Sequence, residues 1–358
     1  EMCIRDSLTC IIKNKYGKVE MSTSFSSNHN FSKGFFYVAD GTFNFYDTEK
    51  KTAYQDCYAS LNAGKTLGIG NYDSANIIHS NGKFYLLVGT STSNRDHFYI
   101  VDAKTLYYEN SAVVGANLSG LTILNEQYGL VTGDGIRRID LKSLNNVRIK
   151  NERLLCFYNS IIYNGKVLSN DTYKDESKVK YYDVNELIAA KEGEAPAVTE
   201  LDIIQKQKIN FVLAKDGNVY TLESADNGCN IVKIKNDFTL EKVFANFQPA
   251  KGPYHSSPTI GMVASETENI IYLVSTDGAI FKYILGDSDS LKAPFIAAES
   301  GVSITAPLQL NQQSGELYVT YTEERKDESK IVVYSKDGKV LHTVDCGESV
   351  PSQILFNN

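Results

Sequence analysis

The sequence contains no tryptophan, and its five histidines are scattered. Indole is a favoured platform for stacking on sugars, so its absence weakens a carbohydrate-binding interpretation, although the 23 tyrosines could substitute. The histidines form no HxH or HExxH motif, which removes the histidine-based metal motifs. His79 ends an apolar stretch and could face a central channel, but a structural histidine is the simpler interpretation.

Cysteine is also sparse, with six in the chain and no CxxC pair. Structural zinc usually requires close pairs of ligands, so the spacing gives a zinc site little support. Buried free thiols in strands are favoured. If the protein is exported, the formation of one long-range disulfide is left undecided, since only geometry can decide it.

Motifs for catalysis and for nucleotide binding are missing as well. There is no GxSxG nucleophile elbow, and GKT at Gly64–Thr66 lacks the glycine spacing of a phosphate loop. The acidic segments Gly286–Ser290 and Glu223–Gly228 do not continue into an EF-hand loop. Calcium binding is therefore left as an alternative only in irregular loops. A net charge of −7 without a basic face argues against nucleic acid. We therefore predict no catalytic residue, metal ligand or cofactor.

What the sequence does contain is a repeated β-unit, seen most clearly in Asn81–Leu106. An Asn-Gly turn leads into an apolar strand, a polar loop follows, and a second strand ends in an Asp-x-x-Thr turn. The first strand recurs in seven copies. The pentapeptide KDESK occupies the same loop position at Lys174–Lys178 and Lys326–Lys330. The repeat length is about 45 residues.

A period of roughly 40–50 residues with four short strands is typical of a β-propeller blade. We therefore expect an all-β, seven-bladed β-propeller of four-stranded antiparallel blades over residues 34–358. Each copy except the first is preceded by a strand, and Val350–Phe356 resembles that strand without a copy after it. The C-terminal strand is therefore expected to close the first blade. Val184–Lys191 is expected to form a helix inserted in the fourth blade.

The residues before the propeller divide into three parts. Residues 1–7, with MCIRDS at Met2–Ser7, look like a translated sequencing-library adapter. Residues 8–25 alternate around an Asn-Lys-Tyr-Gly turn and read as a β-hairpin left over from an immunoglobulin-like or PKD-like domain. Residues 26–33 form a polar linker.

Aspartate recurs at the end of one strand in each of four repeats. Because an Asp side chain can accept hydrogen bonds from the backbone two and three residues ahead, repetition there indicates turn formation instead of catalysis. These residues are Asp47, Asp102, Asp140 and Asp183.

Three segments carry a family resemblance: the hairpin, KGFFYVADG at Lys33–Gly41, and YASLNAGKTLG at Tyr58–Gly68 ahead of the Asn81 strand. Together they resemble the PKD-like family of bacterial surface lipoproteins. The repeats are also similar to YncE-like and quinoprotein-like seven-bladed propellers. The resemblance implies a lipid-anchored protein on the outward face of the outer membrane, beside a TonB-dependent transporter and its SusD-type partner. No lipobox is present, and Cys10 lacks the residues that would precede a lipidated cysteine.

In a propeller, ligands commonly sit on the face where the loops between second and third strands emerge with the loops that precede the inner strands. Several residues in these loops offer aromatic surface or hydrogen-bond donors for a polar or anionic ligand. They are Tyr72, Arg95, His97, Tyr173, Tyr254, His255, Tyr321 and Arg325.

We therefore expect a non-enzymatic surface protein that captures a nutrient, such as a glycan, a siderophore or a corrinoid, for an importer. One alternative is a protein-protein interaction scaffold, which would need a broad contact surface. The other is a propeller enzyme, either a lactonase or a quinone-dependent dehydrogenase. The missing tryptophan motifs and metal ligands argue against the enzyme.

Overall fold

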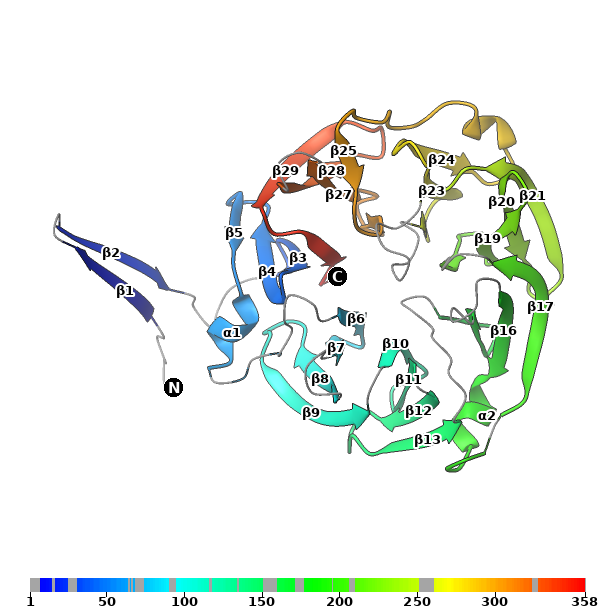
Figure 1. The fold of residues 1–358 in the computed structure, drawn as a ribbon, viewed down its shortest axis with the longest axis horizontal. Helices are drawn as coiled ribbons and strands as arrows, with labels where there is room; N and C mark the ends of the chain where they lie inside the picture. Colours follow the sequence, from blue (N-terminus) through cyan, green and yellow to red (C-terminus); the bar gives the residue numbers. More distant parts are fainter. Residues whose placement is uncertain are drawn as a thin grey trace.

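The computed structural model describes residues 7–14, 17–24, 31–63, 65, 67, 74–89, 95–115, 118–133, 135–150, 160–170, 177–194, 196–205, 210–250, 261–323 and 328–357. Seven antiparallel sheets are arranged radially around a centre, as Figure 1 shows. The predicted seven-bladed propeller is therefore confirmed. None of the helices in these ranges is long and apolar enough to span a bilayer.

Most blades contain four strands, numbered here from the centre outward. Blade 1 contains β30 (Pro351–Leu355), β3 (Gly34–Ala39), β4 (Thr42–Asp47) and β5 (Thr52–Tyr54), and blade 2 contains β6 (Ser74–Ser80), β7 (Lys83–Gly89), β8 (Asp96–Asp102) and β9 (Tyr108–Gly115). Blade 3 contains β10 (Leu118–Ile123), β11 (Tyr128–Gly133), β12 (Gly135–Asp140) and β13 (Asn146–Lys150), and blade 4 contains β14 (Ile161–Tyr163), β15 (Lys166–Asn170), β16 (Ser177–Asp183) and β17 (Val198–Gln205). Blade 5 contains β18 (Val212–Leu213), β19 (Val219–Ala225), β20 (Gly228–Ile234) and β21 (Leu240–Phe247).

The last two blades depart from this pattern. Blade 6 has three strands, β22 (Met262–Ala264), β23 (Ile270–Val274) and β24 (Ile280–Ile284), and its outer position is reduced to a single bridge between Ile280 and Ile296. In blade 7 the inner strand is split into β25 (Val302–Ile304) and β26 (Gln309–Leu310), which both pair with β27 (Leu317–Glu323). The blade continues with β28 (Ser329–Tyr334) and β29 (Val340–Gly347). The two KDESK repeats lead into equivalent third strands, β16 and β28.

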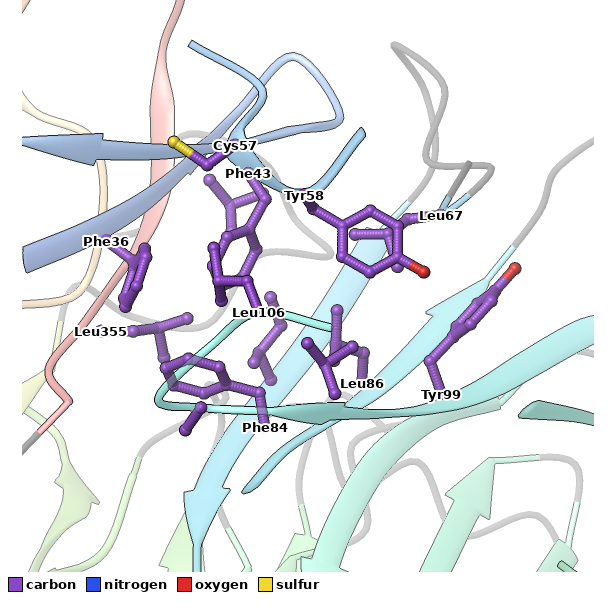
Figure 2. Close-up of a cluster of buried hydrophobic side chains, with 14 of the residues drawn as sticks. Phe36, Phe43, Cys57, Tyr58, Leu67, Phe84, Leu86, Tyr99, Leu106 and Leu355 are labelled. Carbon is purple, nitrogen blue, oxygen red and sulfur yellow. The ribbon is translucent and has the colours of Figure 1, made fainter. Parts of the chain in front are cut away.

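The C-terminal strand closes the ring. β30 pairs with β3 in antiparallel register, with Phe36 opposite Leu355 and Tyr37 opposite Ile354. Leu355 is buried with Phe36 and Phe84 in the core between blades 1 and 2, shown in Figure 2. The predicted non-covalent closure of blade 1 is confirmed, because the innermost strand of the first sheet comes from the end of the chain.

The predicted Asp turns are also confirmed. The Oδ1 atom of Asp102 accepts hydrogen bonds from the backbone N–H groups of Lys104 and Thr105, at 3.1 and 2.8 Å. Asp47, Asp140 and Asp183 make the same pair of bonds to the residues two and three ahead. In blade 4 this turn also caps helix α2 (Val184–Ala189), which is the predicted insertion and buries Leu187. Within the described ranges the other helices are α1 (Cys57–Leu61) and the 3-10 helix η1 (Ser288–Leu291).

Polar side chains link successive blades. The amide of Asn62 donates to the carbonyls of Tyr58 and Leu106 and accepts from the backbone of Tyr108, which ties the segment after α1 to blade 2. Gln353 in β30 donates to the carbonyl of Ile77 in β6. The bonds to Leu106, Tyr108 and Ile77 cross blade boundaries, so they join neighbouring sheets in addition to side-chain packing.

Before the ring, β1 (Ser7–Asn14) and β2 (Gly17–Ser24) form a two-stranded antiparallel hairpin. The predicted hairpin is therefore present, and Ser7 is part of its first strand. Figure 1 shows it beside the ring, on the side of blade 1. Its derivation from a PKD-like domain stays a prediction.

Candidate functional site

The predicted ligand face is defined by two kinds of connection, and we call it the upper face. It carries the turns between the second and third strands of each blade and the segments that lead to the next inner strand. In blade 1 the turn between the second and third strands is Asp40–Gly41, which joins β3 and β4. The segment that leads from blade 7 to the innermost strand of blade 1 is Glu348–Val350. The Asp turns described above lie at the opposite ends of the strands, on the lower face.

Five of the predicted site residues lie outside the described residues: Tyr72, Tyr173, Tyr254, His255 and Arg325. Arg95 lies where it was expected, exposed directly before β8. His97 was predicted in the same loop but lies within β8, half-buried and paired with Val88. The His97 ring stacks on Tyr99 at 5.9 Å between centroids. Binding by these residues stays a prediction.

Tyr321 is not a loop residue, and its predicted position was wrong. It lies within β27, its side chain is 5% exposed, and it packs into the core between blades 6 and 7. Its hydroxyl group lies 3.1 Å from that of Tyr334 across the strand pair. The loop was predicted to begin at Thr320, whereas β27 continues to Glu323, so the Tyr321 ring packs into the core.

A hollow of about 480 Å³ opens on the upper face at the junction between the first and last blades. We call it the seam pocket. Blade 1 contributes β3, β4 and the segment through β5, and blade 7 contributes the end of β29 and the residues after it. It is lined by Tyr37, Ala39, Asp40, Thr42, Asn44, Ala53, Gln55, Asp56, Asp345, Cys346, Gly347 and Ser349. Its volume is within the range of about 300–1,000 Å³ that small-molecule sites occupy.

One wall of the seam pocket is held in place by a small hydrogen-bond network. Thr42 donates to the carbonyl of Ala39 at 2.6 Å, and the Asn44 amide donates to the Thr42 hydroxyl at 3.0 Å. The Asn44 Oδ1 atom accepts from the backbone N–H of Asp56 at 2.9 Å. Asn44 is 3% exposed, so these bonds satisfy a buried amide and fix the wall formed by β4 and α1.

The lining is acidic and contains no lysine, arginine or histidine. Within the described ranges, Asp40, Asp56 and Asp345 form no ion pair. Burial raises the pKa of the Tyr37 hydroxyl, and the neighbouring thiol of Cys346 raises it further. Burial also raises the pKa of the Cys346 thiol to about 12, so this thiol is protonated and unreactive at neutral pH.

The described part of the chain shows no cluster of three or more histidine, cysteine, aspartate or glutamate side chains placed to hold a metal ion. The carboxylates of the seam pocket are thus spread along its wall and do not converge on one point. This arrangement can accept hydrogen bonds from several separated donors of one organic ligand.

Two other hollows lie on the lower side of the ring. One of about 450 Å³ lies between blades 5 and 6, where the Lys233 ammonium group lies 2.9 Å from Asp216 and the Tyr220 hydroxyl donates to the same carboxylate. One of about 460 Å³ lies against α2 and is lined by Glu186 and Glu194. The charges between blades 5 and 6 already compensate one another, unlike those of the seam pocket.

Comparison with known proteins identifies the family. The profile of DUF5074, a domain of unknown function, matches residues 31–357. The chain belongs to the DUF5074 family. A comparison with curated proteins finds no match.

Solved structures agree with a DUF5074 propeller. The crystal structure of a quinonprotein alcohol dehydrogenase-like protein from Bacteroides thetaiotaomicron is similar to this chain, with 99% identity and a TM-score of 0.90. The match covers 99% of this chain and 85% of that one. Dihydro-heme d1 dehydrogenase NirN, solved in complex with DHE, has 12% identity and a TM-score of 0.52, covering 91% of this chain and 75% of its own. At that identity the likeness shows the fold alone.

Sequence reasoning did not find the seam pocket. The Asp40–Gly41 turn was a visible signal, since it joins the second and third strands of a blade. Asp345, however, reaches Asp40 only through closure of the ring. The predicted closure of the ring did not show which side chains would line the seam pocket.

Proposed function

We propose that this DUF5074 propeller is a non-enzymatic binding protein of the bacterial cell surface. It captures a polar nutrient of the glycan, siderophore or corrinoid class and passes it to a TonB-dependent transporter with a SusD-type partner. The surface location follows from the resemblance to PKD-like lipoproteins, in which a lipid anchor holds the protein on the outer membrane.

The observation that supports the proposal is the seam pocket itself. It lies on the face where ligands were expected, its volume suits a small molecule, and its wall is fixed by the buried amide of Asn44. A site built on paired strands is pre-organised, so binding requires little ordering of the protein.

The test is a titration calorimetry screen of the protein against oligosaccharides, ferric siderophores and corrinoids. We expect one class to bind, and we expect Thr42→Val with Asn44→Leu, which removes the polar wall, to abolish that binding. A circular dichroism spectrum of the variant controls for folding. If no nutrient class binds the parent protein, the proposed function is wrong.

A redox enzyme is the second candidate, and the name of the 99% identical Bacteroides protein favours it. A quinone-dependent dehydrogenase would oxidise an alcohol once pyrroloquinoline quinone and a divalent cation are supplied. We expect no reduction of an artificial electron acceptor when the protein is incubated with these additions and a panel of alcohols. Cofactor-dependent turnover would replace the binding proposal with a catalytic one.

A further inference from the structure

The junction between blades 3 and 4 contains a small enclosed cavity. We infer that this cavity is a binding site for one buried water molecule, which joins the two blades through the hydroxyl groups of Thr132 and Ser169. Figure 1 shows the strands of blade 3 beside those of blade 4. The inference does not depend on the proposed function, because it concerns a different part of the ring.

The first observation is a pair of buried hydroxyl groups on facing blades. Thr132 lies on β11 of blade 3 and is 3% exposed, and Ser169 lies on β15 of blade 4 and is 2% exposed. Within the part of the chain that the structure describes, neither Thr132 Oγ1 nor Ser169 Oγ has a hydrogen-bond partner. A buried hydroxyl group without a partner is unfavourable, so both groups point to an occupant of the space beside them.

The second observation is the size of the cavity, which both side chains line. The space open to the centre of a water molecule is about 10 Å³. One water molecule requires roughly 10–15 Å³ by this measure, whereas sites for organic ligands occupy about 300–1,000 Å³. The cavity therefore has room for a single water molecule and excludes a larger ligand.

The walls of the cavity favour a neutral occupant. Leu130, Ile136 and Val167 contribute apolar surface from both blades. The described residues that line the cavity include no carboxylate, imidazole or thiol group, which are the groups that bind metal ions. Since the polar contacts come from hydroxyl groups, they suit water.

Ser160 completes the set of partners. Its hydroxyl group also lines the cavity and pairs with that of Thr122 on β10, the inner strand of blade 3. A buried water molecule typically makes about three hydrogen bonds. Thr132, Ser169 and Ser160 supply three hydroxyl oxygens, and each of them can donate or accept.

The next junction, between blades 4 and 5, bridges the equivalent positions with a side chain. Asn170 on β15 and Thr221 on β19 are buried there, and the Gln205 amide lies between them. Gln205 Oε1 accepts from Asn170 Nδ2 at 2.7 Å, and Gln205 Nε2 donates to Thr221 Oγ1 at 2.9 Å. One group that both donates and accepts thus joins the two blades.

The equivalence of the two junctions follows from strand alternation, in which residues two apart share a face. Leu130 and Val167 pack in the core between blades 3 and 4, two residues before Thr132 and Ser169. Leu168 and Val219 pack in the core between blades 4 and 5, two residues before Asn170 and Thr221. Water can donate and accept as an amide does, so it takes the role of Gln205 at the junction between blades 3 and 4.

The direct test is a crystal structure of the whole chain at a resolution that shows ordered water. We expect one water in the cavity, with its oxygen about 2.5–3.0 Å from Thr132 Oγ1 and Ser169 Oγ. In the double variant Thr132→Val with Ser169→Ala this position should be free of water, because small apolar cavities stay dry. A parent structure without density for water there, or with the two hydroxyl groups bonded directly, would overturn the inference.

Stability measures whether the water joins the blades. Thr132→Val and Ser169→Ala each remove one hydroxyl group and leave the water and the other hydroxyl group with one partner fewer. Each single variant should therefore lower the melting temperature by about 2–4 °C. The double variant removes both partners together with the water, so its shift should be smaller than the sum of the two single shifts.

The matched control is Thr199→Val, which removes an exposed hydroxyl group from β17 in blade 4. Its melting temperature should stay within about 1 °C of the parent. Single variants in the cavity that melt like this control would overturn the bridging role. Single shifts that add fully in the double variant would overturn it too, because two hydroxyl groups that share one water are coupled.

Discussion

Ile354, near the end of the chain, is paired with Tyr37 in the first blade across two antiparallel strands. The Ile354 side chain is 2% exposed and packs in the core between blades 7 and 1, whereas Tyr37 also lines the seam pocket. The strand pair that closes the ring therefore builds one wall of the candidate site. Stability of the closure and shape of the pocket depend on the same residues.

Deletion of Val350–Asn358 is expected to destabilise the protein strongly. It removes β30 from blade 1 and buried contacts of Ile354 and Leu355, and each such aliphatic side chain contributes about 2–5 kcal/mol. We expect the free energy of unfolding, measured with urea, to fall by about 5 kcal/mol or more. Ile354→Ala should lose about 2–4 kcal/mol. A deletion variant that unfolds at the same urea concentration as the parent would contradict the closure.

Asn62 is expected to stabilise the junction between blades 1 and 2. Asn62→Ala removes bonds of 2.8, 2.8 and 2.7 Å and leaves the partner backbone groups without a side-chain partner, which should cost about 3 kcal/mol. Asn185, exposed in α2, is the control, and Asn185→Ala should change stability by less than about 0.5 kcal/mol. Thermal unfolding of both variants provides the measurement. Equal effects would show that the Asn62 bonds do not hold the two blades together.

The Asp turns should make stability depend on acid pH. The backbone N–H of Ser143 lowers the pKa of Asp140, and the Lys166 ammonium group lowers the pKa of Asp183. A pKa that is lower in the folded state contributes stability above the unfolded value of about 4, and this stability is lost as the pH falls through the folded value. We therefore expect the melting temperature to decline below about pH 4. Asp140→Asn with Asp183→Asn should flatten that decline, and an unchanged slope would contradict the assignment.

Tyr321 should behave as a core residue and not as a ligand contact. Tyr321→Phe leaves the Tyr334 hydroxyl without its partner and should cost about 1–2 kcal/mol, whereas Tyr321→Ala should cost about 3–5 kcal/mol. Chemical denaturation measures both values. Ligand affinity should be unchanged in Tyr321→Phe, and a loss of affinity without a loss of stability would restore its predicted role in binding.

The remaining predicted contacts can be tested together. Replacing Arg95, Tyr254 and Arg325 with alanine should weaken ligand binding with little change in melting temperature, because these residues were predicted in upper-face loops. Calorimetry with the nutrient identified by the screen gives the affinity. An unchanged affinity in this triple variant, combined with a loss in Asp345→Asn, would place the ligand in the seam pocket alone.

Periodicity made the architecture predictable. A strand period of two, turn residues at fixed offsets and a repeat of about 45 residues are local properties, so they identify the blades, the Asp turns and the unpaired C-terminal strand. Blade 6 was less predictable. Its outer strand is reduced to the bridge at Ile296, which follows from pairing geometry that no local pattern specifies.

The candidate site was less accessible to the sequence. Tyr321 shows one reason, since β27 continues to Glu323, beyond the predicted start of the loop at Thr320, and so places a predicted loop tyrosine in the core. Asp345 shows the other reason, because its proximity to Asp40 depends on the path of the whole ring.

The sequence by itself determined the repeated blades, the turn aspartates and the strand that closes the ring, because each of these depends on residues close together in the chain. The tertiary structure alone decided which side chains meet at the seam. Asp40 and Asp345 line one pocket only after seven sheets have packed and closed, and Tyr37 on β3 lines the same pocket only in that closed ring. Long-range contacts of this kind follow from accumulated packing geometry, which local pattern does not encode.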